Sequence, residues 1–340
     1  MSLPKQMKAI GFTQSFAIDE PQSLQEFHLA VPSPSSCQLL VKVQAVSVNP
    51  VDTKVRQGAA PELLTDPKIL GFDGVGEIVA MGDEVQGYAL GDRIYYAGDV
   101  TLSGTNSEYH CVDYRIVAPA PKSQSDAQAA ALPLTGLTAW EALFDRLHVG
   151  VTEEKTLLII GGAGGVGSIA IQLAKQLTHL TVIATASREE SKAWCEKLGA
   201  DYVVNHHDLV SSVKNVGFNE VDYIFNAADT IGHWDAMVEL IAPQGMICSI
   251  VESDSGVDLS MLQSKSAGFV WEFMFTRSMY KTSDLKRQHD ILFQLANLTD
   301  AGRIQSTLTT TYQGLDARVL QKAHALLESG KMVGKLAITF

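Results

Sequence analysis

The stretch LLIIGGAGGVGSIAIQLAK, residues 157–175, decides the fold of this 340-residue chain. A short apolar run leads into glycines spaced G-x-G-x-x-G, and apolar residues then recur on one face of a helix. In a dinucleotide-binding unit, the first glycine makes the turn, the second admits the pyrophosphate and the third lets the helix approach the strand. The helix N-terminus then presents backbone N–H groups and a positive dipole end to the phosphates. The predicted cradle consists of Gly162, Ala163, Gly164, Gly165, Val166 and Gly167; an ordinary glycine-rich turn is the alternative.

The composition limits the classes of protein to consider. With 340 residues, the chain is long enough for two domains and a large core. A formal net charge of −12, without a run of basic residues, argues against a nucleic-acid partner, because neutralising phosphates needs clustered Lys and Arg. No apolar stretch reaches membrane-spanning length, and the N-terminus lacks the apolar core of a signal peptide. Four scattered cysteines without a C-x-x-C pair predict free thiols in a reducing compartment, so we expect a cytoplasmic protein.

Two kinds of pattern divide the chain. Between residues 8 and 121, short strand-like segments broken by glycine and proline predict a compact β unit of the barrel type. After helical segments on both sides of Pro133, strands and helices alternate, which is typical of an α/β doubly wound parallel sheet. The expected strands are 157–161, 180–185, 202–205, 221–226, 246–251 and 269–275, and the expected helices between them are 165–177, 188–198, 208–215 and 232–241.

The last part of the chain is predicted to return to the first unit. Beyond residue 278 the pattern indicates helices over 285–298 and 315–329, and the chain ends in the strand-like KLAITF. A terminal strand has to pair with a free sheet edge, and the β unit has such edges. We therefore predict one domain of residues 1–131 and 278–340, interrupted by a parallel-sheet domain of residues 132–277.

The end of the second predicted strand of the parallel sheet indicates which dinucleotide binds. NAD sites place an acidic residue there to bind the ribose hydroxyls, but this chain has Ala186, followed by Ser187 and Arg188. A carboxylate would repel a 2′-phosphate, whereas a hydroxyl and a guanidinium bind one, so the sequence favours NADPH. The alternative is that Ser187 and Glu190 form a capping box and that Arg188 is a solvated surface charge.

Three more side chains belong to the predicted cofactor site. Lys192 lies one helical turn beyond Arg188, and His206 follows the third strand of the parallel sheet, so both are within reach of a 2′-phosphate. Each of them also fits a plain surface residue. Asn226, which ends the fourth predicted strand, completes the set.

Four further motifs, together with the glycine run, resemble a known family. They are VSVNPVDTKVRQG (46–58), LGFDGVGEIVAMG (70–82), GDRI (91–94) and LPLTGLTAWEAL (132–143). In this order they resemble the medium-chain dehydrogenase/reductase superfamily nearly from end to end, and within it the zinc-free quinone oxidoreductase branch. The resemblance implies a GroES-like β-barrel domain, a Rossmann domain that binds the cofactor, and an active site in the cleft.

The chain departs from the zinc-containing members of that superfamily. They place a cysteine where this chain has Asn49, and a His-Glu pair where it has Phe72 and Asp73. An amide and a phenyl ring cannot replace the thiolate and the imidazole that a catalytic zinc requires. The cysteine cluster of a structural zinc is also missing from the sequence. We therefore expect no metal site, although similar sequences are sometimes labelled zinc alcohol dehydrogenases.

Without a metal, the expected substrate is an electron-poor acceptor. Hydride transfer to or from a plain alcohol needs a Lewis acid or a strong proton relay for the developing alkoxide. Quinones and α,β-unsaturated carbonyls delocalise that charge themselves. The sequence therefore predicts an NADPH-dependent oxidoreductase that reduces a small electrophile of one of these two classes. The alternatives are a zinc-dependent alcohol dehydrogenase and a protein that binds NADPH as a sensor without turnover.

Four residues are the predicted catalytic set. By resemblance, Asn49 and Asp52 lie beside the nicotinamide and the acceptor; a turn-forming NPVD that bonds its own backbone is the alternative. Thr135 resembles a hydroxyl that contacts the nicotinamide in relatives, with a helix cap as the alternative. Lys54 stands where many zinc-free relatives carry an aromatic residue. It is either a group that donates a proton or stabilises an enolate oxygen, or a surface charge.

Two aromatic segments complete the predictions. Tyr95 and Tyr96 follow GDRI, and strand alternation sends one of them inward, to the core or to a substrate. The stretch FVWEFMFTRSMY (269–280) has aromatic residues at period two, which predicts a buried last strand or a subunit interface. Pairing of two such strands across a two-fold axis would give a homodimer.

Overall fold

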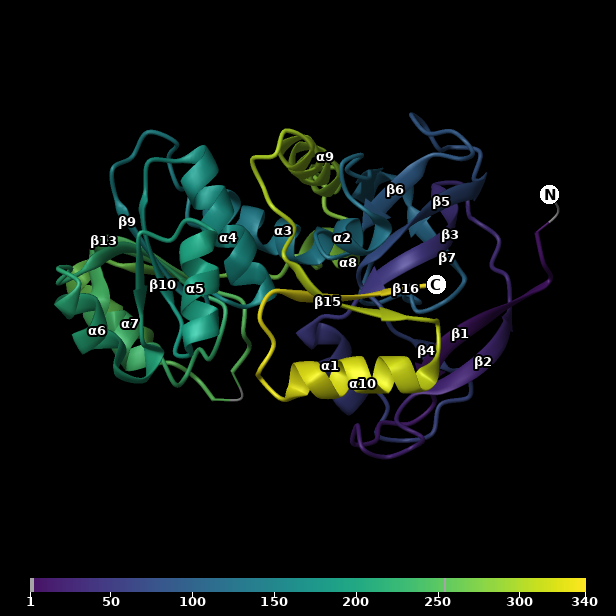
Figure 1. Ribbon diagram of the computed structural model, residues 1–340, viewed down its shortest axis with the longest axis horizontal. Coiled ribbons are helices and arrows are strands. Elements are labelled where there is room, and N and C mark those ends of the chain that lie inside the picture. Colours follow the sequence, from purple (N-terminus) through teal and green to yellow (C-terminus); the bar gives the residue numbers. More distant parts are fainter. Residues whose placement is uncertain (1–2, 254) are drawn as a thin grey trace. The chain divides into compact units, whose positions relative to one another are not determined.

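The structure is a computed structural model that describes residues 3–253 and 255–340. The chain divides into two compact units (Figure 1). The first comprises Met1–Leu134, Phe275–Gly302 and Ser306–Phe340, and the second comprises Thr135–Met274 and Arg303–Gln305. The chain therefore crosses between the units a few residues from the positions expected from the sequence.

A seven-stranded sheet forms the centre of the first unit. Its strands follow the order β15-β16-β3-β5-β6-β8, with β7 also paired to β3, while β2, β1 and β4 make a separate three-stranded sheet. Leu39, Val41, Ile78 and Ile94 are buried on the larger sheet, because apolar residues alternate along its strands. The strands are β1 (Gln6–Phe12), β2 (Gln25–Ala30), β3 (Gln38–Ser47), β4 (Lys68–Ile69), β5 (Gly74–Met81), β6 (Arg93–Tyr96), β7 (Tyr109–Asp113), β8 (Val117–Pro119), β15 (Leu308–Gln313) and β16 (Lys335–Thr339).

The C-terminal strand pairs with the β unit, which confirms the prediction for KLAITF. Strand β16 runs antiparallel to β3, with Ala337 opposite Ser47 and Thr339 opposite Ala45. On its other side β16 pairs in parallel with β15. The C-terminal end of the chain thus becomes an interior strand of a sheet whose other strands come mostly from the first 120 residues.

The helices of the first unit include one that the sequence analysis missed. Helix α1 (Pro50–Gly58) follows β3 directly, with Asn49 at its N-cap and Pro50 in its first turn. Asn at the N-cap and Pro at the first position are a helix-start signal, so the NPVD segment begins a helix rather than an isolated turn. Helix α1 packs against α10 (Ala317–Glu328) (Figure 1). The others are η1 (Tyr114–Ile116), α2 (Asp126–Ala130), α8 (Thr276–Tyr280) and α9 (Arg287–Asp300).

The second unit is a six-stranded parallel sheet with helices between its strands, which confirms the predicted doubly wound fold. The strand order is β11-β10-β9-β12-β13-β14, so the chain starts in the middle, at β9, and reverses its direction of travel after β11. The strands are β9 (Thr156–Ile160), β10 (Thr181–Thr185), β11 (Tyr202–Val204), β12 (Val221–Asn226), β13 (Ile241–Ser249) and β14 (Gly268–Trp271). The helices are α3 (Pro133–Trp140), η2 (Glu141–Arg146), α4 (Gly165–Leu177), α5 (Glu189–Lys197), η3 (His206–Asp208), α6 (Leu209–Asn215), α7 (Trp234–Leu240) and η4 (Leu259–Lys265), with α3 crossing from the first unit.

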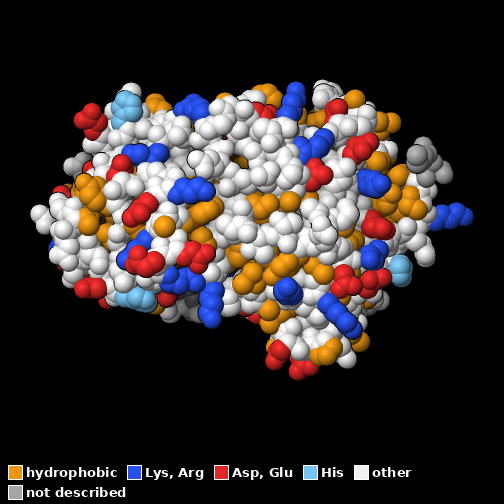
Figure 2. Space-filling view, in the orientation of Figure 1, with side chains coloured by type: hydrophobic (Ala, Val, Ile, Leu, Met, Phe, Trp, Pro, Cys, Tyr) orange, Lys and Arg blue, Asp and Glu red, His pale blue; other side chains and the backbone are white. Residues whose placement is uncertain are grey.

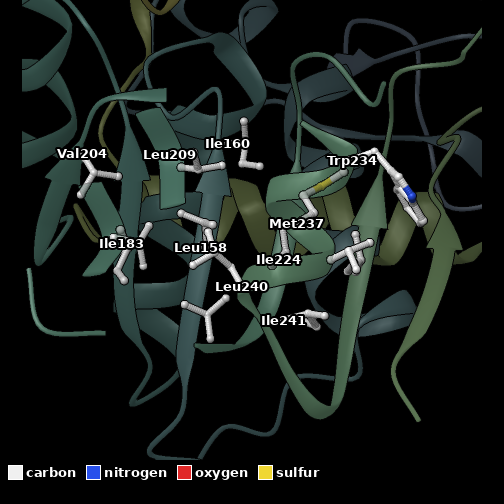
Figure 3. Packing of buried hydrophobic residues seen from close by; sticks show 14 of the residues in the cluster. Leu158, Ile160, Ile183, Val204, Leu209, Ile224, Trp234, Met237, Leu240 and Ile241 are labelled. Atoms are coloured by element: carbon white, nitrogen blue, oxygen red, sulfur yellow. The ribbon is translucent and has the colours of Figure 1, made fainter. Parts of the chain in front are cut away.

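Alternate residues of the central strands fill the core beneath α6 and α7. Leu158 and Ile160 of β9 and Ile183 of β10 pack there against Leu209 of α6 and Met237 of α7 (Figure 3). These side chains are fully or almost fully buried. Burial of each such residue stabilises the fold by roughly 1.5–3 kcal/mol. None of the helices within the described residues is long and apolar enough to cross a membrane.

The prediction for the last strand is wrong in its second half. Strand β14 ends at Trp271, and Phe275 instead lies at the N-cap of α8, where its ring packs edge-on against Phe72 at 5.4 Å. Trp271 and Phe273 are each 46% exposed. The period-two aromatic pattern therefore does not describe one buried face, because the chain turns into a helix within it.

Candidate active site

The glycine run forms a cradle at the N-terminus of α4. Close packing requires glycine at position 162, since a Cβ on Gly162 would lie 2.8 Å from the Ala184 Cβ. At Gly167 a Cβ would lie 2.3 Å from the Gly161 carbonyl oxygen. At Gly164, in contrast, a Cβ would meet only the Gly161 oxygen, at 3.5 Å, and this residue is exposed. Two glycines thus allow close packing, and Gly164 leaves open space for a ligand.

The start of α4 provides the donors of this cradle. Gly164 is the N-cap, and α4 runs for 13 residues from Gly165. The first backbone N–H groups of a helix, here those of Gly165, Val166 and Gly167, have no carbonyl partner within the helix. Ala163 precedes the N-cap on the same turn and is 9% exposed. A pyrophosphate is the kind of anion that such a helix start binds.

The end of β10 places the predicted 2′-phosphate residues at the same sheet edge. Ala186 is buried, Ser187 is half-buried and Arg188 is exposed. The alternative capping box of Ser187 and Glu190 does not form: α5 begins at Glu189 with Arg188 as its N-cap, and the Arg188 backbone N–H donates to Ser191 Oγ at 3.2 Å. The Ser187 side chain is therefore not needed for capping.

The remaining predicted cofactor residues have different environments. Lys192 pairs with Glu189 at 3.0 Å across the first turn of α5. His206 lies in η3, directly after β11. Asn226 is fully buried, and its Nδ2 donates to Ser249 Oγ at 3.1 Å and to Thr230 Oγ1 at 3.3 Å. These bonds make Asn226 an anchor for the loop that follows β12.

In the first unit, a buried polar cluster surrounds the start of α1. The Asn49 amide is fixed on both sides: its Nδ2 donates to Asp73 Oδ2 at 2.7 Å, and its Oδ1 accepts from Lys335 Nζ at 2.5 Å. The ammonium of Lys335 also donates to the Val48 carbonyl at 3.0 Å and lies 3.5 Å from Asp73 Oδ2. Asp73 accepts the Leu134 N–H at 2.7 Å. We call Asn49, Asp52, Asp73 and Lys335 the polar cluster.

Asp52 completes this cluster through backbone groups. Its carboxylate accepts from the Asn49 N–H at 2.8 Å and from the Gly71 N–H at 2.9 Å. The first of these bonds is the local backbone contact that the alternative for NPVD expected. The second holds α1 to the segment that precedes β5. Asp52 thereby fixes the position of Asn49 relative to Asp73.

The charges of the polar cluster are strongly perturbed by burial. Loss of solvation raises the pKa of Asp52 to about 7, against the hydrogen bonds from Asn49 and Gly71 that favour the carboxylate. The same cause raises the pKa of Asp73 to about 6, against the attraction of Lys335. Burial also lowers the pKa of Lys335, and the two carboxylates oppose that change. Groups whose protonation changes near neutral pH are typical of sites that move protons.

The other sequence candidates lie outside the polar cluster. Lys54 is exposed on α1. Thr135 is 2% exposed and lies within α3 rather than at its cap. Tyr95 and Tyr96 are both completely buried, so the expectation that only one points inward is wrong. Tyr95 Oη donates to the Leu292 carbonyl at 2.5 Å, and the Tyr96 hydroxyl lies 3.1 Å from His110 Nδ1.

Sequence reasoning missed the part that Lys335 and Asp73 play in this site. In the sequence, Asp73 is distinguished only by the comparison with zinc-containing relatives, and Lys335 is only the first residue of KLAITF. A lysine at the start of an apolar strand is a weak signal, since most lysines are exposed. The register of β16 on β3 brings Lys335 opposite Asn49, two residues beyond the Ala337–Ser47 pair.

The residues of this unit do not fit a catalytic zinc. The Phe72 ring is buried against Phe275, and the Asn49 amide oxygen already accepts a hydrogen bond from the Lys335 ammonium. An ammonium beside Asp73 also competes with any cation for that carboxylate. Over residues 3–253 and 255–340, no group of three or more His, Cys, Asp or Glu side chains is placed to hold a metal ion.

Comparisons with known proteins agree with this architecture. Residues 35–122 match the alcohol dehydrogenase GroES-like domain, and residues 198–338 match the zinc-binding dehydrogenase family. A zinc-type alcohol dehydrogenase-like protein of Staphylococcus epidermidis is 46% identical over 98% of this chain and 99% of its own length. Among solved structures, a Rhizobium etli CFN 42 protein named for the zinc-dependent alcohol dehydrogenases has 43% identity and a TM-score of 0.94, covering 98% of both chains.

A third comparison concerns the branch of the superfamily. The Escherichia coli quinone oxidoreductase, solved in complex with NADPH, is 26% identical with a TM-score of 0.83, covering 98% of this chain and 100% of its own. The fold, the glycine cradle and these matches together place the protein in a family. The chain belongs to the medium-chain dehydrogenase/reductase superfamily, and it is an oxidoreductase of that type.

Proposed function

We propose that this oxidoreductase uses NADPH to reduce a quinone or an α,β-unsaturated carbonyl without a metal ion. The observation that carries the proposal is the cradle at α4 combined with the end of β10. Gly164 leaves room for a pyrophosphate. Buried Ala186 takes the position at which NAD-binding proteins have an acidic residue, whose carboxylate would repel a 2′-phosphate. The NADPH complex of the Escherichia coli relative supports the same choice of cofactor.

The chain's own residues have separable tasks toward the dinucleotide. The N–H groups at the start of α4 would hold the pyrophosphate. Ser187 and Arg188 would hold the 2′-phosphate, and Lys192 and His206 are further proposed contacts of that phosphate. When bound, NADPH would supply the hydride. Asn226 keeps the loop after β12 in place through Thr230 and Ser249.

The zinc-free part of the proposal rests on the donors present in the first unit. Asn49 and Phe72 supply neither a thiolate nor an imidazole, and the Asp73 carboxylate is already paired with Lys335, in spite of the names of the similar proteins. Without a Lewis acid, an acceptor that delocalises negative charge itself is the best substrate class. A quinone and an enone both meet this requirement.

The polar cluster is the proposed source of the proton that accompanies hydride. Asp52, with its pKa raised to about 7, is about half protonated at neutral pH, and Lys335 favours the charged form of the neighbouring Asp73. The proposed catalytic residues of the first unit are Asn49, Asp52 and the exposed Lys54. The proposed catalytic residue of the second unit is Thr135. The bonds that fix the Asn49 amide on both sides support a positioning role for that residue.

The surface supports a proposal for the partners. We propose a small electrophile and a second copy of the chain, and no nucleic acid or membrane. On the face in Figure 2, acidic and basic side chains are interspersed over the described surface. Strand β14 ends the parallel sheet and carries Trp271, which is 46% exposed, so it is the proposed dimer contact. A monomeric mass by light scattering would contradict it. Four cysteines without disulfides agree with a cytoplasmic location.

The deciding experiment measures the loss of nicotinamide absorbance with NADPH and NADH separately, against one quinone and one 2-alkenal, with a chelator present. We expect oxidation of NADPH well ahead of NADH, and the better acceptor identifies the subclass. Activity that requires stoichiometric zinc would favour an alcohol dehydrogenase instead. Tight binding of NADPH without turnover of either acceptor would favour a sensor.

A further inference from the structure

Three histidines gather at the carboxyl edge of the parallel sheet. His206 and His207 form the start of η3, directly after β11, and His233 is the N-cap of α7, after β12. The ring centroids of His206 and His207 are 4.2 Å apart, and those of His206 and His233 are 6.1 Å apart with perpendicular planes. We call these three residues the histidine cluster. The sequence places only two of them together; the fold adds the third.

The histidine cluster lies next to the residues proposed to bind the 2′-phosphate. Strands β10 and β11 are parallel neighbours with Thr185 opposite Val204. The Ala186 N–H donates to the Val204 carbonyl at 2.9 Å, so the backbones of the two strands are still paired one residue after β10. From there the segment after β10 continues to Arg188, and the segment after β11 continues to His206. The two side chains therefore start from adjacent strand ends.

The loop that carries His233 is held firmly. Thr230 Oγ1 lies 2.6 Å from Ser249 Oγ and donates to the Val251 carbonyl at 2.6 Å. Asp229 Oδ1 accepts from the Gly232 N–H at 3.0 Å, which closes the turn before His233. The next residue, Trp234, is buried and packs edge-on against Phe269. His233 thus has a fixed position beside His206 rather than a place on a free loop.

The charges around the histidine cluster make its protonation sensitive to an anion. Burial lowers the pKa of His206, and repulsion from His207 and His233 lowers it further. Burial also lowers the pKa of His233, where the carboxylate of Asp229 partly opposes the effect and His207 adds to it. The charged residues at the starts of the flanking elements are Asp208 before α6, Asp235 in the first turn of α7, and Arg188, Glu189, Glu190 and Lys192 at α5. An added dianion would reverse this balance and favour an imidazolium.

We propose that the histidine cluster takes up a proton when the 2′-phosphate of NADPH or NADP⁺ binds beside it. The inference rests on the proposed function and adds to it a dependence of cofactor choice on pH. An imidazole nitrogen of the cluster gains an N–H bond, the proton comes from the solvent, and the phosphate stays a dianion. By linkage, the affinity for the phosphorylated dinucleotide rises as the pH falls from 8 to 7, whereas the affinity for NAD⁺ does not change.

The test is a calorimetric titration of the whole protein with NADP⁺ and with NAD⁺ at pH 7.5, in buffers of different ionisation enthalpy and with a chelator. The dependence of the heat on the buffer gives the number of protons taken up. NADP⁺ and NAD⁺ differ only in the 2′-phosphate, so their difference isolates its effect. We expect about 0.5–1 more proton for NADP⁺, and hence a three- to tenfold gain in its affinity per unit of pH.

Two variants and a control assign the proton to the cluster. The double substitution His206→Asn and His233→Asn should remove most of the extra proton uptake, and the single substitution His206→Asn should remove part of it. His179→Asn, at an exposed histidine after α4, should behave as the wild type. A melting curve without ligand shows that each variant is folded.

The outcomes separate this inference from the proposed function. If NADP⁺ binds no more tightly than NAD⁺, the proposed preference for NADPH is wrong, and the inference falls with it. If NADP⁺ binds more tightly but takes up no more protons than NAD⁺, the inference alone is overturned. Extra proton uptake that persists in both folded variants would also overturn it.

Discussion

Lys335 Nζ lies 2.5 Å from Asn49 Oδ1, although 286 residues separate the two along the chain. The contact exists because β16 is antiparallel to β3, so the start of one strand meets the end of the other. It orients the Asn49 amide, since an ammonium can only donate and therefore selects the oxygen. The nitrogen is then left to face Asp73. A buried cation thereby determines how the start of α1 presents its side chains.

Replacing this lysine should destabilise the first unit. Lys335→Met leaves Asp73 buried without its cation, and breaking such a pair costs about 3–5 kcal/mol. The free energy of unfolding in urea measures the loss. Adding Asp73→Asn removes the unpaired charge and keeps an acceptor for the Leu134 N–H, so the double variant should be more stable than Lys335→Met alone. Lys5→Met, at an exposed lysine, is the control. A loss below about 1 kcal/mol for Lys335→Met would show that the pair contributes little.

The glycines of the cradle should separate folding from ligand binding. Gly164→Ala fits the backbone, because the residue has φ −71° and its Cβ would meet only one atom, at 3.5 Å. It should change the free energy of unfolding by less than about 1 kcal/mol and weaken NADPH binding at least tenfold by blocking the pyrophosphate. Gly167→Ala should instead lower stability strongly, since its Cβ would lie 2.3 Å from a backbone oxygen. Urea unfolding and a fluorescence titration with NADPH measure the two effects. Unchanged affinity in Gly164→Ala would argue against a cradle.

Arg188 should determine the preference for the phosphorylated cofactor. Arg188→Gln keeps a polar side chain but shortens it and removes the charge, and a hydrogen bond to a charged group contributes roughly 1.5–3 kcal/mol. We therefore expect the Kd of NADPH to rise by about ten- to a hundredfold and the Kd of NADH to stay the same. Arg318→Gln, at an exposed arginine of α10, is the matched control. Equal losses for both cofactors would mean that Arg188 acts on something other than the 2′-phosphate.

His324 should make the protein less stable in acid. It is fully buried on α10, and burial, followed by the charge of Arg56, lowers its pKa to about 3. The unfolded chain, with an ordinary histidine pKa near 6.5, binds the proton more readily, so stability falls as the pH drops below that value. At pH 5 this one residue accounts for about 2 kcal/mol relative to pH 7.5.

The substitution His324→Leu isolates that contribution. The drop in the free energy of unfolding between pH 7.5 and pH 5 should be about 2 kcal/mol smaller in this variant than in the wild type. Comparing the two pH values within each protein cancels any packing change at neutral pH. His179→Leu, at an exposed histidine, should keep the wild-type drop. If His324→Leu keeps it too, the buried imidazole is protonated in the folded state.

Local patterns were sufficient for the start of the parallel-sheet unit. The apolar run before Gly162, the glycine spacing and the helical periodicity beyond it belong to neighbouring residues, and they predict β9, the turn and α4 at nearly their observed bounds. The end of the sheet was harder to predict. The aromatic residues from 269 to 275 keep a strand-like period, yet β14 ends at Trp271, and Phe275 packs against Phe72, 203 positions earlier in the chain.

By itself, the sequence determined the class of fold, the order of the elements and the glycine cradle, because hydrophobic periodicity and turn chemistry act between residues close in the chain. Only the tertiary structure decided which buried charges meet. The pair of Lys335 with Asn49, and the contact of His206 with His233, depend on strand register and on which loops share an edge. A charged residue is recognised as functional only when its burial and its partner are known, and both are properties of the folded chain.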